Sequence, residues 1–257
     1  MFRRKQPKIK FYSLIPAVNT LYPIIPSSKL KRKWVEEEKV EFEKFKSKCP
    51  FHMKDGVRSI GKCPAISTAM STGFVLTAPA DFKINTNGDG TTINVTQKPC
   101  LKHAPLVDVH NEHQTEWIVD HDKMNVLSQT IKINSPWRVI CSDPDIVFLI
   151  TKVQFWKESR FTQIDGILDP LIANELNCQL MWHVMEGTET VEAGTPLAQI
   201  IPVSRSLLFH PDYVVEQATE ELYRLEDEMI YAGLHKFEPD IKTKIKNMAQ
   251  LLKKYGY

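Results

Sequence analysis

The sequence predicts a mainly β protein, with an antiparallel β-sandwich or jelly-roll core, a helix near the N-terminus and two C-terminal helices. Short apolar runs recur about every ten residues over residues 60–205, which is typical of strands joined by turns. The segment Asn87-Gly-Asp-Gly is the clearest hairpin turn, because these residues accept positive φ. Two stretches with a helical apolar period, 31–48 and 206–257, flank the β region.

Length and composition are those of a globular protein. With 257 residues, of which 42% are hydrophobic and 25% charged, the chain can bury a core of its own. The net charge of +2 does not favour nucleic acid as a partner, and no apolar stretch approaches the roughly twenty residues of a membrane span. Five cysteines, an odd number, fit a reducing compartment better than a disulfide framework. No Walker A or GxGxxG pattern is present, so we expect no cofactor.

Residues 1–30 are expected to form a strand, Ile9–Ile15, followed by an extended arm. Pro16, Pro23 and Pro26 interrupt the arm, and each proline removes a backbone donor, so this segment cannot be a central strand. A proline-restrained arm loses less entropy when it docks on a neighbouring subunit. We therefore expect its apolar residues to contact another chain: Leu14, Ile15, Leu21, Tyr22, Ile24 and Ile25.

Residues 31–59 are expected to hold a helix and a linker. Over 31–48, glutamates and lysines alternate at i, i+4 spacing around a few apolar positions, which indicates an exposed brace. Residues 60–205 then form the β core. This core begins with a short helix at 63–71 and continues through strands expected at 73–79, 81–85, 91–97, 129–133, 137–141, 147–153, 161–167, 178–184 and 197–203.

Residues 206–257 change to a helical pattern. Asp212 is a candidate N-cap for a helix that runs to about Tyr231, and a second, basic helix is expected from about Pro239 to Tyr255. Because the first helix is acidic, we expect the two to pair with each other. The apolar stripe of the first helix is a second candidate for contact with another chain: Leu222, Leu225 and Met229.

Two Cys/His pairs are the weak candidates for a metal site. Cys49 with His52, and Cys100 with His103, each place a thiol and an imidazole three residues apart, and zinc prefers these ligands. The two pairs lie about fifty residues apart and lack the knuckles of short zinc ribbons, so we predict no bound metal. The nearby segment 108–122 carries three histidines and three aspartates, and we interpret it as a polar loop.

Two interpretations of Trp137 and Arg138 remain open. An exposed Trp137 beside Arg138 would suit a base or sugar together with its phosphate. A tryptophan that opens a strand more often packs into a core, because large aromatic side chains dominate core burial, and we favour that interpretation.

The order of motifs between residues 164 and 203 resembles a known family. Gly166-Ile-Leu-Asp-Pro170 is followed by an alternating run, Glu175–Val184, and then by Val191-Glu-Ala-Gly-Thr-Pro-Leu-Ala-Gln-Ile-Ile-Pro202. This arrangement resembles the middle of dUTPase-like proteins. The resemblance implies one wall of a β-clip or jelly-roll-like barrel.

The same segment makes physical sense from its residues alone, as an antiparallel core hairpin. Gly166 and Gly194 are expected at turns, where glycine accepts positive φ without steric cost. Pro202 should end its strand or lie at an edge. A buried Gln199 must find a partner for its amide, which we expect to be backbone across the hairpin.

In dUTPase-like enzymes, the aspartate of the glycine-hydrophobic-hydrophobic-aspartate motif acts on the attacking water. The resemblance therefore carries catalysis to one position, Asp169. The surrounding sequence departs from the enzyme pattern: Pro170 follows directly, and residues 171–173 replace the expected aromatic residue. The nearest match to the upstream phosphate-binding turn is Lys157-Glu-Ser-Arg160, in altered order. A dUTPase-like nucleotide-binding protein or nucleotide hydrolase is thus the second interpretation of the chain.

Four separated motifs resemble an uncharacterised family of tailed-phage and bacterial proteins: Lys10–Ser13, Lys62–Ile66, Asn134–Trp137 and Gly194–Pro202. This resemblance implies no activity. Together with the proline-rich arm and the terminal helices, it leads to a non-enzymatic structural or assembly protein, a component of a tailed-phage virion. We expect its partners to be other protein subunits, in a homo-oligomer or a larger viral assembly. Its expected location is the virion, or the host bacterial cytoplasm during assembly.

Overall fold

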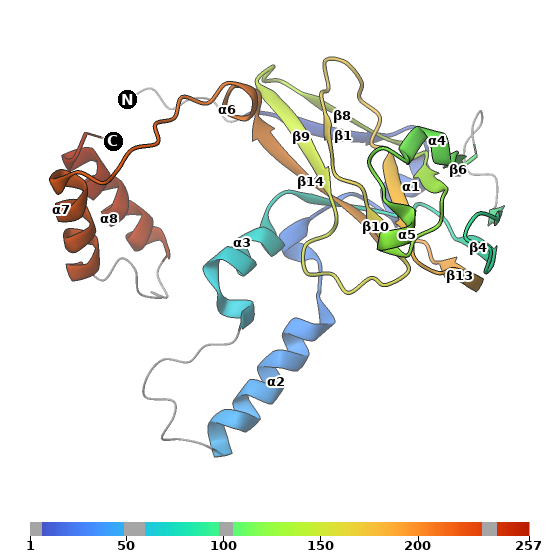
Figure 1. Ribbon diagram of the computed structural model, residues 1–257, viewed down its shortest axis with the longest axis horizontal. Helices are drawn as coiled ribbons and strands as arrows, with labels where there is room; N and C mark the ends of the chain where they lie inside the picture. The colour runs from blue at the N-terminus through green and yellow to red at the C-terminus, as the bar shows by residue number, and fades with distance from the viewer. Residues whose placement is uncertain (1–6, 49–59, 98–104, 233–240, 257) are drawn as a thin grey trace.

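Figure 1 shows the computed structural model, which describes residues 7–48, 60–97, 105–232 and 241–256. Its strands pair antiparallel in four sheets, and helices lie around and beside them. The predicted fold class, mainly β with an antiparallel core, is confirmed.

The largest sheet has five strands in the order β11-β9-β14-β3-β2, and a four-stranded sheet has the order β10-β12-β7-β6. A three-stranded sheet, β13-β4-β5, and a two-stranded ribbon, β1-β8, complete the sheets of the described residues. The strand bounds are β1 Ile9–Ser13, β2 Ile25–Pro26, β3 Phe74–Thr77, β4 Phe82–Asn87, β5 Ile93–Gln97, β6 Val107–His110, β7 Thr130–Ile133, β8 Trp137–Cys141, β9 Ile146–Thr151, β10 Phe161–Gln163, β11 Gly166–Leu168, β12 Cys178–Trp182, β13 Glu186–Val191 and β14 Pro196–Ser204.

Two of the expected helices, near residues 31–48 and 63–71, appear as α2 and α3. No helix in the described ranges is both long and apolar enough to cross a bilayer. The helix bounds are α1 Pro16–Leu21, α2 Lys33–Lys48, α3 Pro64–Ser71, α4 Glu112–Thr115, α5 His121–Met124, α6 Arg205–Phe209, α7 Glu220–Tyr231 and α8 Ile241–Lys254.

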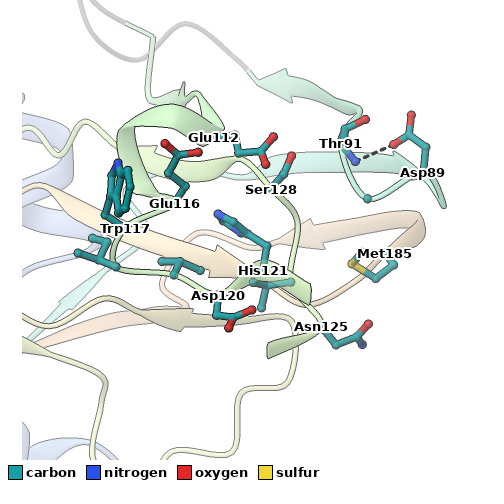
Figure 2. Close-up of a pocket in the computed structure, with 14 residues that line it drawn as sticks. Asp89, Thr91, Glu112, Glu116, Trp117, Asp120, His121, Asn125, Ser128 and Met185 are labelled. Atoms are coloured by element: carbon teal, nitrogen blue, oxygen red, sulfur yellow. Dashed lines mark hydrogen bonds between the residues drawn. The ribbon is translucent and has the colours of Figure 1, made fainter. Parts of the chain in front are cut away.

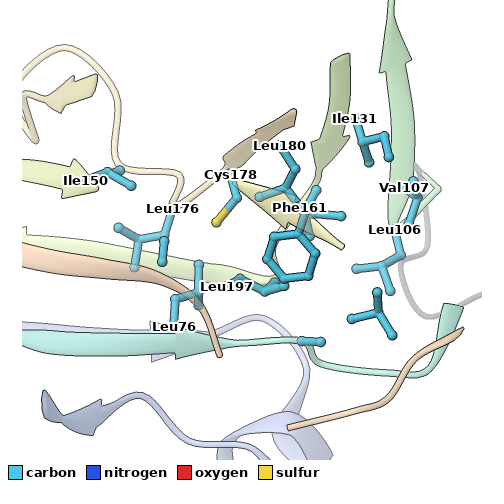
Figure 3. Close-up of a cluster of buried hydrophobic side chains, with 14 of the residues drawn as sticks. Leu76, Leu106, Val107, Ile131, Ile150, Phe161, Leu176, Cys178, Leu180 and Leu197 are labelled. Atoms are coloured by element: carbon cyan, nitrogen blue, oxygen red, sulfur yellow. The ribbon is translucent and has the colours of Figure 1, made fainter. Parts of the chain in front are cut away.

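Inward-facing residues from the sheets build the hydrophobic core, part of which is drawn in Figure 3. The period of two is clearest in β4, where Phe82 and Ile84 are buried and the intervening Lys83 is exposed. Trp137 and Trp182 are among the largest fully buried side chains. Trp137 therefore belongs to the core, as we favoured, and does not present its ring to a ligand.

The N-terminal segment is more structured than the extended arm that the prolines suggested. β1 pairs along its whole length with β8, and Phe11 in β1 packs edge-on against Phe74 at 4.9 Å between ring centroids. Residues 16–21 form α1, with Pro16 in its first turn, where a missing N–H costs no hydrogen bond. Val18 of this helix is only 5% exposed and belongs to the core.

The expected hairpin between the alternating run and the last core strand does not form. β12 pairs with β10 and β7, whereas β14 pairs with β3 and β9. Between them the chain passes through β13, which pairs with β4 and is not evident in the sequence because four of its six residues are Glu or Thr and a fifth is Gly. The expected strand at 161–167 likewise divides into β10 and β11, which lie in different sheets.

The turn residues of this region follow the expectation in part. Gly194 has φ +89°, as expected, whereas Gly166 opens β11 without a positive φ, since that position continues an extended strand. Pro202 lies in β14 beyond the end of β3, where only β9 still pairs with it. Pro202 therefore lies where β14 has an open edge, as predicted.

Gln199 is fully buried, and all the partners of its amide are backbone groups. Its Nε2 donates to the carbonyls of Ala69 (2.9 Å) and Thr72 (2.6 Å), and its Oε1 accepts from the N–H of Gln154 (3.0 Å). These partners belong to α3 and its C-cap and to the segment after β9, not to the far strand of a hairpin. The expected partner type is right and its place is wrong, because the hairpin itself is absent.

The first C-terminal helix begins later than predicted. Asp212 does not cap it: residues 210–219 are non-helical and exposed, and α7 starts after Thr219, whose Oγ1 accepts from the N–H of Leu222 (3.4 Å). α7 and α8 pair with each other, as expected from their charges, and Figure 1 shows this hairpin beside the β core at the end of an extended connection. Glu228 of α7 accepts from Lys254 (2.6 Å) of α8.

Candidate functional site

Asp169, the one position to which catalysis could be carried over, lies in the turn after β11. Arg205, at the start of α6, donates from Nη2 to Oδ1 (2.7 Å) and from Nη1 to Oδ2 (2.5 Å) of this carboxylate. The N–H of Leu171 also donates to Oδ1 (3.0 Å), and the side chain of Asp169 is 15% exposed. The carboxylate thus has a protein partner on each oxygen.

The electrostatics of this pair do not suit a general base. The Arg205 guanidinium and the Leu171 amide hold the pKa of Asp169 below its ordinary value. A carboxylate with lowered proton affinity and both oxygens engaged is poorly placed to take a proton from water. The geometry is that of a bidentate structural link between the turn after β11 and the end of β14.

The nearest match to a phosphate-binding turn is also paired within the chain. The guanidinium of Arg160 donates from Nη2 and Nε to the two carboxylate oxygens of Glu158, each at 2.8 Å. Glu192 lies 3.5 Å from the same guanidinium, and the carbonyl of Thr190 accepts a further hydrogen bond from it. The two carboxylates beside this guanidinium would repel an approaching phosphate, so the turn is poorly suited to phosphate binding.

The apolar residues predicted to contact another chain from the N-terminal segment divide into two groups. Ile15, Tyr22 and Ile24 pack against the core, and Ile25 lies in β2, paired with β3. The exposed members are Leu14, at 61%, and Leu21, at 66%. Much of this segment therefore satisfies its apolar surface within its own chain.

The apolar stripe of the first C-terminal helix lies within the helical hairpin. Leu225 is 6% exposed, and Leu222 and Met229 are half-buried on α7. Their contact with another chain stays a prediction.

The metal candidates Cys49, His52, Cys100 and His103 lie outside the described residues. Within the ranges that the structure describes, no group of three or more His, Cys, Asp or Glu could hold a metal ion. Cys178, in contrast, is a core thiol, and its burial raises the pKa to about 12, which makes it inert.

A run of exposed hydrophobic side chains follows the end of the β core, from α6 into the non-helical residues after it, of which residues 213–215 were expected to begin the first C-terminal helix. We call residues 207–215 the exposed linker. Its large apolar side chains are 42% to 88% exposed: Leu207, Leu208, Phe209, Tyr213, Val214 and Val215.

A second surface feature is a cavity of about 690 Å³ beside α4, α5 and the β4–β5 turn, drawn in Figure 2. We call it the Trp117 cavity, after a tryptophan that is 89% exposed at its rim. The sequence analysis took this segment for a polar loop. The missed signal was an aromatic and an aliphatic residue, Trp117 and Ile118, between acidic residues of that loop.

The comparisons with known proteins leave the function open. No family model and no curated protein matches the chain. Among solved structures, the native dUTPase of EIAV matches 58% of this chain and 85% of its own, with a TM-score of 0.30 and 13% sequence identity. A likeness of this size carries no argument about fold detail or activity.

Proposed function

We propose that the protein is a non-enzymatic structural or assembly protein, and that the exposed linker is a main surface for contact with other subunits. One observation carries the proposal: six large hydrophobic side chains within nine residues face solvent. Surface hydrophobic residues are common singly, but a dense run of them marks an interaction site.

The location of the linker fits contact with a partner. Its first three residues belong to α6, directly after β14, and Figure 1 shows the chain after α6 running toward the α7–α8 hairpin. Its side chains have no place in the core cluster, which ends with residues of β14. At about 25 cal/mol per Å² of apolar surface, covering Tyr213, Val214 and Val215 would contribute about 4–8 kcal/mol. Coverage by a second protein would therefore stabilise both the linker and the complex.

The contacts of Asp169 and Arg160 support the non-enzymatic half of the proposal. Each is held in an ion pair within the chain, so Asp169 is not left to activate a water molecule and Arg160 is not left to bind a nucleotide phosphate. The second interpretation, a dUTPase-like nucleotide binder or hydrolase, gains no observation that favours it. As the setting, we propose the virion of a tailed phage, or the host cytoplasm during assembly, on the four sequence motifs alone.

The proposal is tested by removing the apolar character of the linker in the full chain. We expect Tyr213→Ser, Val214→Ser and Val215→Ser, combined in one variant, to lower the oligomeric state or weaken self-association, measured by light scattering and sedimentation velocity. At a concentration where the parent is dissociated, the melting temperature should stay unchanged, because these side chains are exposed in the isolated chain. The matched control is Val40→Ser with Ile140→Ser, which removes exposed aliphatic groups elsewhere.

Two results would contradict the proposal. One is a parent protein that stays monomeric even at high protein concentration. The other is a linker variant that associates like the parent and like the control.

A further inference from the structure

We propose that a pocket between α2 and α3 binds the phosphate group of a small molecule. Its walls come from the 3₁₀ turn Ser27–Lys29, from the start of α2 and from α3, which Figure 1 shows on the same side of the β core. We call it the Arg32 pocket. Its volume of about 260 Å³ lies just below the roughly 300–1,000 Å³ of sites for drug-sized ligands and suits a smaller one. This inference does not depend on the assembly function proposed above, since it concerns another surface and a small ligand.

Arg32, which lines this pocket, is a buried cation without a counter-ion. It is 5% exposed, and no carboxylate in the described part of the chain forms an ion pair with it. Its Nε donates to the carbonyl of Gln154 at 2.9 Å, but its contacts with the carbonyls of Ser27 and Leu30 and with the Ser27 hydroxyl are each 3.4 Å long. Those three are longer than the roughly 2.7–3.2 Å of ordinary N–H···O hydrogen bonds. A buried charge that meets only neutral and mostly distant acceptors is costly, and a bound anion would compensate it.

The Arg32 guanidinium keeps its charge despite its burial. Burial lowers its pKa, because desolvation disfavours the charged form, but an arginine side chain starts from so high a value that it stays protonated in proteins. Its Nη2 carries two N–H groups and has one acceptor among the described residues, the Ser27 hydroxyl. The pocket therefore offers a permanent positive charge with a donor to spare. A guanidinium presents its donors in a planar fork that matches two oxygens of a phosphate.

Hydrogen bonds to two other elements fix the backbone around Arg32. Ser27 is fully buried, and its hydroxyl donates to the carbonyl of Met70 in α3 at 2.7 Å. The bond from Arg32 Nε to Gln154 ties the same corner to the segment after β9. The cation is thus positioned before any ligand arrives, so binding costs little ordering of the protein.

Two lysines add to the positive charge of the pocket. Lys31 and Lys39 line it and are exposed, and neither forms an ion pair with another residue that the structure describes. Glu36 is the one carboxylate among the described lining residues. Three cations therefore face one carboxylate, and the balance attracts an anion.

The rest of the lining favours a phosphate that is attached to a small organic group. Leu30, Val35 and Met70 give the pocket an apolar wall. The exposed hydroxyl of Ser28 can donate to an oxyanion, whereas the two other lining serines already donate to carbonyls of α3. A phosphate monoester matches both parts, because its oxygens suit the cations and its carbon group suits the apolar wall. Inorganic phosphate matches the cations alone.

The test is calorimetric titration of the full chain with inorganic phosphate and with phenyl phosphate, at constant ionic strength. At pH 8 both probes are dianions, since the second pKa of a phosphate is about 6. We expect saturable binding of phenyl phosphate at one site per chain, with a Kd below about 1 mM. That Kd should rise several-fold at pH 5, where the probe carries one charge less.

Charge variants at exposed positions decide whether the pocket is the site. Lys31→Gln combined with Lys39→Gln should raise the Kd about three- to tenfold, and Glu36→Gln should lower it about two- to fivefold. The matched control, Lys33→Gln with Lys44→Gln, removes two cations of α2 that lie outside the pocket and should bind like the parent. All of these side chains are exposed, so every variant should keep the parent melting temperature.

Arg32→Lys tests the guanidinium itself, because it keeps the charge and removes the planar fork. Its Kd should be at least about tenfold higher than that of the parent. Arg32 is buried, so its variant is compared only if it melts cooperatively, and the lysine pair and Glu36→Gln decide the question otherwise. Binding of phenyl phosphate alone identifies a monoester as the ligand, and equal binding of both probes identifies free phosphate. Absence of binding by both probes, or a lysine-pair Kd no higher than that of the control, would overturn the inference.

Discussion

Deletion of residues 1–28 should unfold the β domain, because this segment contributes to the core. Val18 is buried, and Ile9, Phe11, Ile15, Tyr22 and Ile24 pack partly buried against the same cluster. A fully buried side chain of this size contributes about 1.5–3 kcal/mol, and a half-buried one about half of that. The six together contribute about 5–10 kcal/mol, which is comparable to the whole stability of a typical domain of about 5–15 kcal/mol.

The assay compares two truncations by circular dichroism and thermal unfolding. The chain lacking residues 1–28 should be insoluble or show no cooperative transition. The chain lacking residues 210–257 should melt within a few degrees of the parent, because no residue of that segment belongs to the core cluster. The single substitution Val18→Ala tests the same point with less disruption: it should lower the free energy of unfolding by about 2 kcal/mol and the melting temperature by about 4–8 °C. Val214→Ala, at an exposed position, should change neither quantity.

A cooperative transition in the chain lacking residues 1–28, close to that of the parent, would refute this reasoning. It would show that β1 and α1 cover a core that is complete without them. The segment would then be a detachable arm, as its prolines first suggested, and Leu14 and Leu21 would return as candidates for contact with another chain.

Further predictions concern the remaining sites. Purified protein should release no pyrophosphate from dUTP or dCTP with magnesium; release that Asp169→Asn abolishes would restore the enzyme interpretation. Elemental analysis should find no stoichiometric zinc, and chelator should leave the melting temperature unchanged; one zinc per chain, lost in Cys100→Ser, would contradict this. The pKa of Asp169 is lowered on folding, so Asp169→Asn should destabilise the protein at neutral pH and progressively less as the pH falls below about 4. Gly73→Ala should cost about 3 kcal/mol or more in thermal unfolding, because its φ is +71° and a Cβ would lie 2.2 Å from the carbonyl oxygen of Ile200; Gly187→Ala, with φ +109° and no atom within 4 Å, is the control and should cost less.

The parts of the fold that could be predicted are those with a local signal. The β4–β5 turn was evident from Asn87-Gly-Asp-Gly in the sequence, and Gly88 and Gly90 indeed take positive φ. β4 was evident from its alternating apolar residues, and its burial alternates in the same way. β13 and β6 were missed because both are edge strands with several polar residues, and such short segments resemble loops. The pairing of strands was not predictable either: only long-range contacts decide that β12 joins β7 and β14 joins β9.

The candidate sites follow the same division. The glycine-hydrophobic-hydrophobic-aspartate motif identified Asp169 but not its state, because the Arg205 that occupies it lies 36 residues further along the chain. The Trp117 cavity was not predictable from the sequence for a similar reason: its walls come from the β4–β5 turn and from α4 and α5, which lie apart in the chain. A motif reports which groups are present, whereas their availability depends on distant partners.

Two apolar segments of similar composition differ in how far their own chain covers them. Residues 14–25 and residues 207–215 are both hydrophobic and both contain proline, yet the first packs largely on the core and the second faces solvent. The difference is topological: the first is flanked by β1 and β2, which pair with β8 and β3, whereas the second follows the end of β14, where no described strand remains to pair with it. An apolar segment that its own chain does not cover keeps its hydrophobic free energy for another molecule. This is the physical ground for our proposal that the exposed linker, more than the N-terminal segment, contacts other subunits.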